Sequence, residues 1–318
     1  MQYEPLIREA WRLTMRFRSL WILGLFAGGA APSCSLTNRF EAPRTTPTTT
    51  SPQAEQFMRA VADWVAANIG LLVVIGLLVV LLVLVGIVIS LIAAGGLTRA
   101  GADAARGGAP TLGTAWSAGL RFFWRYVGLA LVFLVLAIGI AIVAAIMFGI
   151  AVLLVGEPRG TPERGVIAVV LGLVGAIVAI VVGVVVASTL TFAQRAIAIN
   201  DVGPIEALGF GWRVFRANTG TSIVLWIINI VLAIAVGIAV AIAIVIVAIP
   251  FIIVGVILWF ALGASGAAIA WAGLGVLALL ATALVLGAIA GTFFWHFWTL
   301  AYLRLAPSAA RAPAAAPA

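Results

Sequence analysis

This chain of 318 residues is 64% hydrophobic and only 9% charged, with a formal net charge of +8. Soluble domains carry about 25% charged residues, so the composition excludes an ordinary soluble protein. The 18 basic residues are all arginine and flank apolar runs, which favours membrane orientation over nucleic-acid binding. The single cysteine excludes an intrachain disulfide framework.

Six apolar stretches predict an all-α, polytopic membrane helical bundle with about six transmembrane helices. The first, residues 19–31, is short and fits both a retained span and the core of a signal peptide. The other five exceed the roughly 20 residues that cross a bilayer. They cover residues 69–94, 127–155, 166–193, 222–249 and 267–301. Residues 251–260, after Pro250, either extend the fifth span or fold as an outer-leaflet hairpin.

A polar segment occurs twice between the spans. The first copy reads RAGAD (99–103), then Pro110, GLR (119–121) and Arg125; the second reads RAIA (195–198), then Asp201, Pro204, GWR (211–213) and Arg216. A helical apolar stripe follows each proline, with arginines beside it, and a similar stripe begins the chain. These patterns predict three parallel repeats, each an amphipathic interfacial helix followed by two spans.

We therefore expect a single integral membrane domain over residues 1–305. Its repeats cover residues 3–98, 110–197 and 204–303, with a disordered outer loop over 32–55 and a disordered cytoplasmic tail over 306–318. After the loop, a helix on the outer membrane surface is predicted to run into the second span, because its apolar residues share one face. These are Phe57, Met58, Val61, Trp64 and Val65.

Most arginines fall on the side that holds both termini, which predicts a multi-pass protein with both termini in the cytoplasm. The absence of lysine beside abundant Ala, Gly and Val is typical of a GC-rich bacterial genome, so we expect the bacterial cytoplasmic membrane.

The sequence offers little for catalysis. No acid or arginine lies inside the six apolar runs, and the one histidine, His296, has no second ligand nearby. We expect no enzyme activity, no cofactor and no metal. His296 is more typical of an interfacial aromatic belt than of a proton or metal site. Asn229, an amide within a span, predicts a partner on another helix. Gly24-x-x-x-Gly28 and Gly287-x-x-x-Gly291 predict close helix packing within the monomer.

The repeated Arg/Asp pairs are the best functional candidates. Arg99 and Asp103 are four residues apart and can pair on one helix. Arg195 and Asp201 meet only if the helix ends between them, near Asn200. One interpretation is orientation, capping and ion pairing; the other is a ring of arginines that binds lipid phosphates or an acidic partner. The candidate lipid- or partner-binding residues are Arg99, Asp103, Arg121, Arg125, Arg195, Asp201, Arg213 and Arg216.

Residues 10–29 and the two RA…D…P…GxR segments resemble uncharacterised bacterial six-span membrane proteins. These are similar to the membrane domain fused to some glycerophosphodiester phosphodiesterases. The resemblance covers most of residues 1–305 and implies the fold; it transfers no catalytic residue. We expect a scaffold, accessory or lipid-interacting module with an arginine-rich cytoplasmic rim. Its partners would be membrane lipids, anionic headgroups among them, or an unidentified membrane or cytoplasmic protein. The alternative is a transporter or channel for a small or amphipathic solute.

Overall fold

The computed structural model describes residues 2–29, 52–155, 162–263 and 265–310, and these residues form helices and no strand. The predicted all-α class is confirmed. The chain divides into two compact units, residues 31–90 and residues 1–30 with 91–318. Helix α4 (Ile69–Ala105) starts in the first of these units and ends in the second.

The smaller unit contains α3 (Pro52–Ala67) and the first part of α4. The predicted helix after the outer loop is confirmed, and its apolar face is exposed, including Phe57, Met58 and Trp64. Asn68 separates the two helices, and its side-chain amide donates to the Trp64 carbonyl at 2.8 Å. Residues 32–51 of the predicted disordered loop lie outside the described residues. Its last residues, 52–55, belong to α3 instead.

The N-terminal part of the larger unit is a chain of short helices. α1 (Tyr3–Arg16) is followed by Phe17 as its C-cap. α2 (Trp21–Gly24) is preceded by a 3₁₀ turn and followed by a π turn that reaches Gly29. The first predicted span therefore forms only a short apolar helix, Arg18–Ala27. Five described helices, rather than six, are long and apolar enough to cross a membrane.

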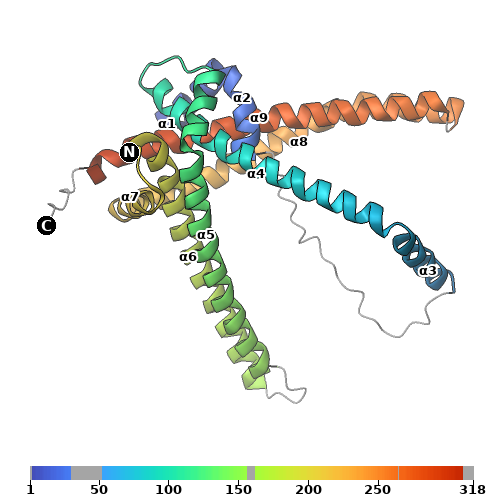
Figure 1. Cartoon of the computed structure of the whole chain (residues 1–318), viewed down its shortest axis with the longest axis horizontal. Helices are drawn as coiled ribbons and strands as arrows, with labels where there is room; N and C mark the ends of the chain where they lie inside the picture. The colour runs from blue at the N-terminus through green and yellow to red at the C-terminus, as the bar shows by residue number, and fades with distance from the viewer. Residues whose placement is uncertain (1, 30–51, 156–161, 264, 311–318) are drawn as a thin grey trace. The chain divides into compact units, whose positions relative to one another are not determined.

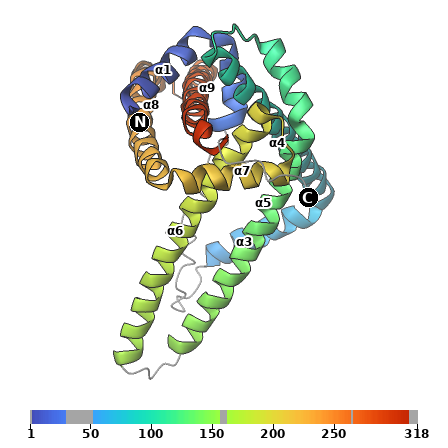
Figure 2. The ribbon, with the colours of Figure 1, turned by 90° about the vertical axis from the view of Figure 1, so that its left-hand side faces the viewer.

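The remaining helices of the larger unit are α5 (Leu112–Val155), α6 (Pro162–Asn200), α7 (Pro204–Ala217), α8 (Thr219–Leu262) and α9 (Gly266–Ala310). α5 and α6 form one hairpin of long helices, and α8 and α9 form another (Figures 1 and 2). α8 continues through Pro250 to Leu262, so residues 251–260 extend the helix. α9 reaches Ala310, so the first residues of the predicted disordered tail are helical, which suits their alanine-rich sequence.

The second amphipathic segment is the beginning of α5 and not the separate interfacial helix that the sequence predicts. α7 ends at Ala217. Just after it, the Asn218 side-chain amide donates to the Val214 carbonyl and the Thr219 hydroxyl donates to the Phe215 carbonyl, both at 3.1 Å. Such side-chain bonds compete with helix continuation. At the matching place in α5, the Tyr126 hydroxyl instead donates to the Gln194 carbonyl at 2.7 Å, and the helix continues.

The buried core of the larger unit lies at one end of its long helices. We call this region the hub: α1, α2 and α7 with the C-terminal ends of α4, α6 and α9 and the N-terminal ends of α5 and α8. Figure 2 shows α1, α7 and α9 gathered beside one end of the α5–α6 hairpin. The opposite parts of these helices, which we call the far halves, expose their large apolar side chains.

Candidate functional site

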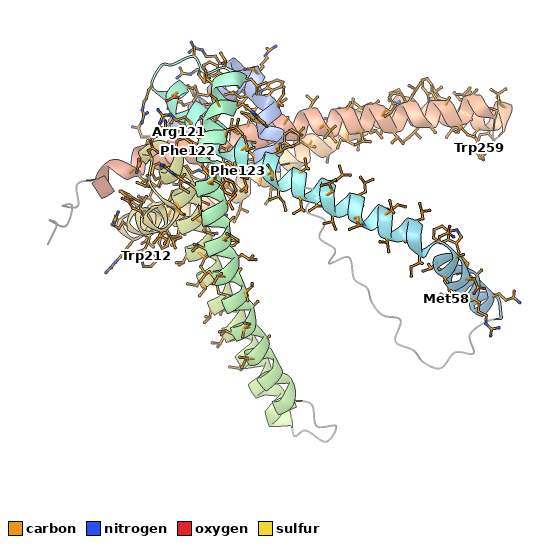
Figure 3. All side chains as sticks on the ribbon, in the orientation of Figure 1. Met58, Arg121, Phe122, Phe123, Trp212 and Trp259 are labelled. Atoms are coloured by element: carbon orange, nitrogen blue, oxygen red, sulfur yellow. The ribbon has the colours of Figure 1, made fainter. Side chains whose placement is uncertain are left out.

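Each amphipathic segment of the hub carries a small residue, a bulky apolar residue and an arginine in succession. The three copies are Ala10-Trp11-Arg12 in α1, Gly119-Leu120-Arg121 in α5 and Gly211-Trp212-Arg213 in α7. The small residue is buried in each copy, and the arginine is exposed. The apolar residue between them is also exposed, by 51% at Trp11, 51% at Leu120 and 45% at Trp212. Figure 3 labels Arg121 and Trp212 at the hub. We call these the apolar–Arg pairs.

The small residues permit close packing on a neighbouring span. A Cβ atom on Gly119 would lie 2.1 Å from the Ile92 carbonyl oxygen of α4. A Cβ atom on Gly211 would lie 2.3 Å from the Thr189 carbonyl oxygen of α6. Close helix approach of this kind is typical of small residues in membrane proteins. The glycine side of each segment therefore faces the core, and its apolar–Arg pair faces outward.

α1 packs on α9, the last span, through side-chain contacts. Thr14 contacts His296, with 3.2 Å between the hydroxyl oxygen and Nδ1, and Trp11 meets Phe293 edge-on. Arg304 of α9 pairs with Glu9 at 2.8 Å. The three amphipathic segments thus pack on α9, α4 and α6, which are the spans that end in the hub. This correspondence is local, and the threefold repeat stays a prediction.

The first predicted ion pair is confirmed. Arg99 Nε lies 3.4 Å from Asp103 Oδ2, and Arg106 approaches the same carboxylate at 3.9 Å. α4 ends at Ala105 because Gly107 adopts a φ of +88°, and the Gly108 N–H donates to the Asp103 carbonyl at 2.9 Å. A glycine in this left-handed conformation is a common helix terminator. Asp103 therefore remains on the surface of its own helix, beside Arg99.

The second predicted pair does not form. α6 ends at Asn200, and Asp201 follows in the left-handed region with a φ of 60°. Its carboxylate accepts hydrogen bonds from Arg121 and Arg125 of α5. Arg99 donates to the Ala198 carbonyl at 3.4 Å. Three arginines therefore lie at the C-terminal end of α6, where cations are favoured by the helix dipole.

Arg195 lies inside the hub rather than on an exposed rim. It is 3% exposed, and its guanidinium lies 4.6 Å from the centre of the Trp295 ring. Its Nη1 donates to the Thr191 carbonyl at 2.9 Å and to Gln194 Oε1 at 3.1 Å, while its buried Nε has no partner. Among the described residues, no carboxylate pairs with Arg195. The cation–π contact and the two neutral acceptors compensate its burial in part.

The hub also contains polar groups that sequence reasoning missed. Trp295 Nε1 donates to the Thr98 hydroxyl at 2.8 Å and so ties α9 to α4. His296 is fully buried, which corrects its expected place in an interfacial belt. The Thr14 hydroxyl donates to the Ala10 carbonyl and so accepts from His296 Nδ1–H; Nε2 is left without a partner. Within the described residues there is no group of three metal-ligating side chains.

Two helix-packing predictions are confirmed. Asn229 of α8 accepts a hydrogen bond from Trp298 Nε1 of α9 at 3.1 Å, as expected for an amide that links two helices. Gly24 packs within the monomer, because a Cβ atom there would lie 2.7 Å from the Ala288 carbonyl oxygen of α9. The prediction is wrong for Gly287, because a Cβ atom there would have no atom within 4 Å.

Arg213 and Arg216 of α7 are the members of the candidate set that remain exposed and have no acidic partner among the described residues. Arg213 lies 4.4 Å from the centre of the Phe210 ring. Over the described ranges, no carboxylate pairs with Arg213, Arg216 or Arg12. These guanidinium groups are free to bind an external anion.

Comparison with known proteins identifies a family. No curated protein and no solved structure is similar to the chain. The sequence model of a family of unknown function, DUF7544, matches residues 13–308, a range that includes all five long helices except the last residues of α9. The chain belongs to the DUF7544 family.

Proposed function

We propose that this protein is a membrane module without catalytic chemistry whose hub binds anionic lipid headgroups. The observation that carries the proposal is the set of three exposed apolar–Arg pairs. A bulky apolar side chain beside an arginine is the arrangement that anchors a helix at the boundary between lipid and water. The arrangement recurs on three helices of the hub, α1, α5 and α7.

The helix lengths support this placement. α8 has 44 residues and is therefore about 66 Å long. The hydrocarbon core of a bilayer is about 30 Å thick, so one half of α8 is enough to cross it. We place the far halves in the lipid because their side chains are almost uniformly apolar. The hub, with its buried Arg195 and His296, then lies at the headgroup level and beyond it.

Ion pairs and burial within the chain reduce the number of arginines that are available to bind lipid. Arg99, Arg121 and Arg125 contact groups of this chain, and Arg195 is buried. The remaining exposed arginines without a carboxylate are suited to phosphate, which guanidinium groups bind through paired hydrogen bonds. In the described part of the larger unit they are Arg12, Arg16, Arg18, Arg213 and Arg216, of which Arg12 and Arg213 belong to the apolar–Arg pairs. The resemblance to a membrane domain fused to phosphodiesterases is compatible with such an accessory role.

The test compares lipid binding by the purified full chain and by the double variant Arg12→Gln/Arg213→Gln. Dioctanoyl phosphatidylglycerol and dioctanoyl phosphatidylcholine are titrated onto the protein in maltoside detergent, and bound lipid is counted by native mass spectrometry. The native chain should prefer the anionic lipid. An arginine near the membrane surface contributes about 1 kcal/mol, so the double variant should bind it roughly thirty-fold more weakly.

The matched control is Arg8→Gln/Arg106→Gln, which removes the same net charge from arginines that pair with Glu4 and Asp103. It should retain most of the affinity. The proposal is wrong if the control loses as much as the test variant, or if the native chain binds both lipids equally.

A further inference from the structure

We propose that Arg121 and Arg125 form a second phosphate site for an anionic lipid, and that Asp201 occupies it as an internal competitor. We call these three residues the Asp201 joint. The inference rests on the proposed function, because it assigns a specific site and a regulated state to the same lipid ligand. It departs from that function in one respect: the site is closed in the structure, and lipid must displace a carboxylate of the chain to enter it.

The geometry of the joint is that of a phosphate clamp. Arg121 and Arg125 are one helical turn apart on α5 and so share a face. Arg121 Nη2 donates to Asp201 Oδ2, and Arg125 Nη1 donates to Asp201 Oδ1. Two guanidinium groups thus converge on the two oxygens of one carboxylate. A phosphodiester presents the same pair of anionic oxygens to an arginine clamp.

Charge and exposure show that the clamp can be reached and that its charge is not balanced. One carboxylate faces two arginines, so the joint retains a net positive charge. The side chains of Arg121, Arg125 and Asp201 are 67%, 38% and 43% exposed. Ion pairs this exposed are weak because water and salt screen them. A lipid phosphate can therefore replace Asp201 without a large loss of binding energy.

The surroundings of the clamp fit a lipid better than a free phosphate. Leu120 precedes Arg121 and is 51% exposed, while Trp124 precedes Arg125 and is 77% exposed. These apolar side chains lie on the same turns of α5 as the clamp arginines. They offer a surface for the glycerol and acyl region of a lipid whose phosphate is held by the arginines.

Asp201 is placed so that it can leave. It lies in the connection between α6 and α7, outside both helices. Its φ of 60° is a conformation that costs energy for most residues other than glycine. Moving its side chain breaks no helical hydrogen bond. Lipid binding would break the ion pairs of Asp201 that join the α6–α7 connection to α5, so this contact would depend on lipid.

The contrast with Asp103 supports this assignment. Asp103 is held within α4, at 3.4 Å from Arg99 of the same helix and at 3.9 Å from Arg106 just after it. Its partners are on its own helix or just after its end, so their release would separate no two elements. Of the two shared carboxylates, Asp201 is the one that links separate helices.

The deciding variant is Asp201→Asn, which removes the competing charge while asparagine tolerates the left-handed conformation. The control is Glu206→Gln, which removes one negative charge from an exposed residue of α7. The same phosphatidylglycerol titration in maltoside detergent is used. Each exposed ion pair is worth up to about 1 kcal/mol, so Asp201→Asn should tighten binding roughly three- to thirty-fold. Glu206→Gln should change the affinity less than about two-fold, since Glu206 forms no ion pair within the described residues.

A triple variant and a competition experiment test whether the gain in affinity comes from lipid binding at Arg121 and Arg125. The triple variant Asp201→Asn/Arg121→Gln/Arg125→Gln should lose the whole gain, and inorganic phosphate should not compete with the lipid. Thermal unfolding of each variant checks that it is folded. Equal affinities for Asp201→Asn and Glu206→Gln would overturn the inference, as would full competition by inorganic phosphate. If one of these overturning results is obtained while Arg12→Gln/Arg213→Gln still lowers the affinity for phosphatidylglycerol, the proposed function stands and this inference alone fails.

Discussion

The two ends of each long helix in the larger unit differ in how deeply their side chains are buried against other helices. At the hub end of α9, Phe297, Thr299 and Tyr302 are buried and in contact with other helices. In its far half, Leu277 and Val285 are more than half exposed. α8 repeats the contrast, with Leu225 fully buried and the far half open. A single helix thus contains a packed end and an end that has few protein neighbours.

This difference indicates which contacts determine the arrangement of the helices. Far halves are built from Val, Ile, Leu and Ala, which lipid tails solvate as well as another helix does. Apolarity alone therefore does not drive these surfaces together in a membrane, and in the far halves of α8 and α9 a hydrogen bond from Trp271 Nε1 to the Phe251 carbonyl at 3.0 Å joins the two helices. The hub ends instead contain Gly, Thr, Trp, Arg and His, each with a defined contact. Close backbone approach and hydrogen bonds across helices, rather than bulk apolarity, select the arrangement of the hub.

The largest loss of stability is expected when a methyl group is added at the hub. Gly119→Ala would place a Cβ atom 2.1 Å from a backbone oxygen of α4, and Gly211→Ala would place one 2.3 Å from a backbone oxygen of α6. Backbone cannot move aside as a flexible side chain can, so each change should destabilise the protein by about 1–3 kcal/mol or more. Thermal unfolding of the purified protein in detergent measures the loss.

The controls are the same substitution in the far halves. Gly183 of α6 and Gly237 of α8 have no atom within 4 Å of an added Cβ. Alanine is a better helix former than glycine by roughly 1 kcal/mol, so Gly183→Ala and Gly237→Ala should leave stability unchanged or raise it. A similar loss at all four positions would show that the hub and the far halves are equally packed.

The sequence predicts the features that depend on local periodicity. The apolar face of α3, the long apolar helices and the i, i+4 pair of Arg99 with Asp103 all follow from spacing within one segment. Asn229 is a similar case, because an amide within a span has few alternatives to a partner on another helix. The broken first helix is harder, since its length is near the limit for a span.

The sequence does not predict contacts that depend on how distant segments pack. Asp201 pairs with arginines 76 and 80 positions earlier in the chain, because α6 ends at Asn200 and leaves Asp201 beside α5. Arg195 is buried because Phe192 and Ala196 on either side of it belong to the core. Alanine neighbours are the one signal that could have indicated this, since small residues allow helices to close over a charge.

A second prediction concerns the buried polar groups of the hub. Thr14→Val keeps the shape of the side chain but removes the acceptor for His296 Nδ1. A buried donor without a partner costs about 1–3 kcal/mol, so the melting temperature should fall by several degrees. Thr282→Val is the control, because the Thr282 hydroxyl bonds only the Ala278 carbonyl of its own helix at 2.8 Å. If both variants melt alike, the Thr14–His296 contact does not stabilise the hub.

The smallest expected effect lies at the border of the two regions, where Asn229 of α8 accepts from Trp298 of α9. A double-mutant cycle with Asn229→Leu and Trp298→Phe isolates this bond from the packing of the ring on Phe192 and Trp226. Hydrogen bonds between membrane helices average about 0.6 kcal/mol, so the coupling should be of that size and favourable. A coupling of zero would place the border of the specific hub contacts closer to Ser188 and Trp226, whose 2.7 Å hydrogen bond joins α6 to α8. A coupling well above the average would extend the specifically packed region into α8, because a bond worth that much must be shielded from competing partners.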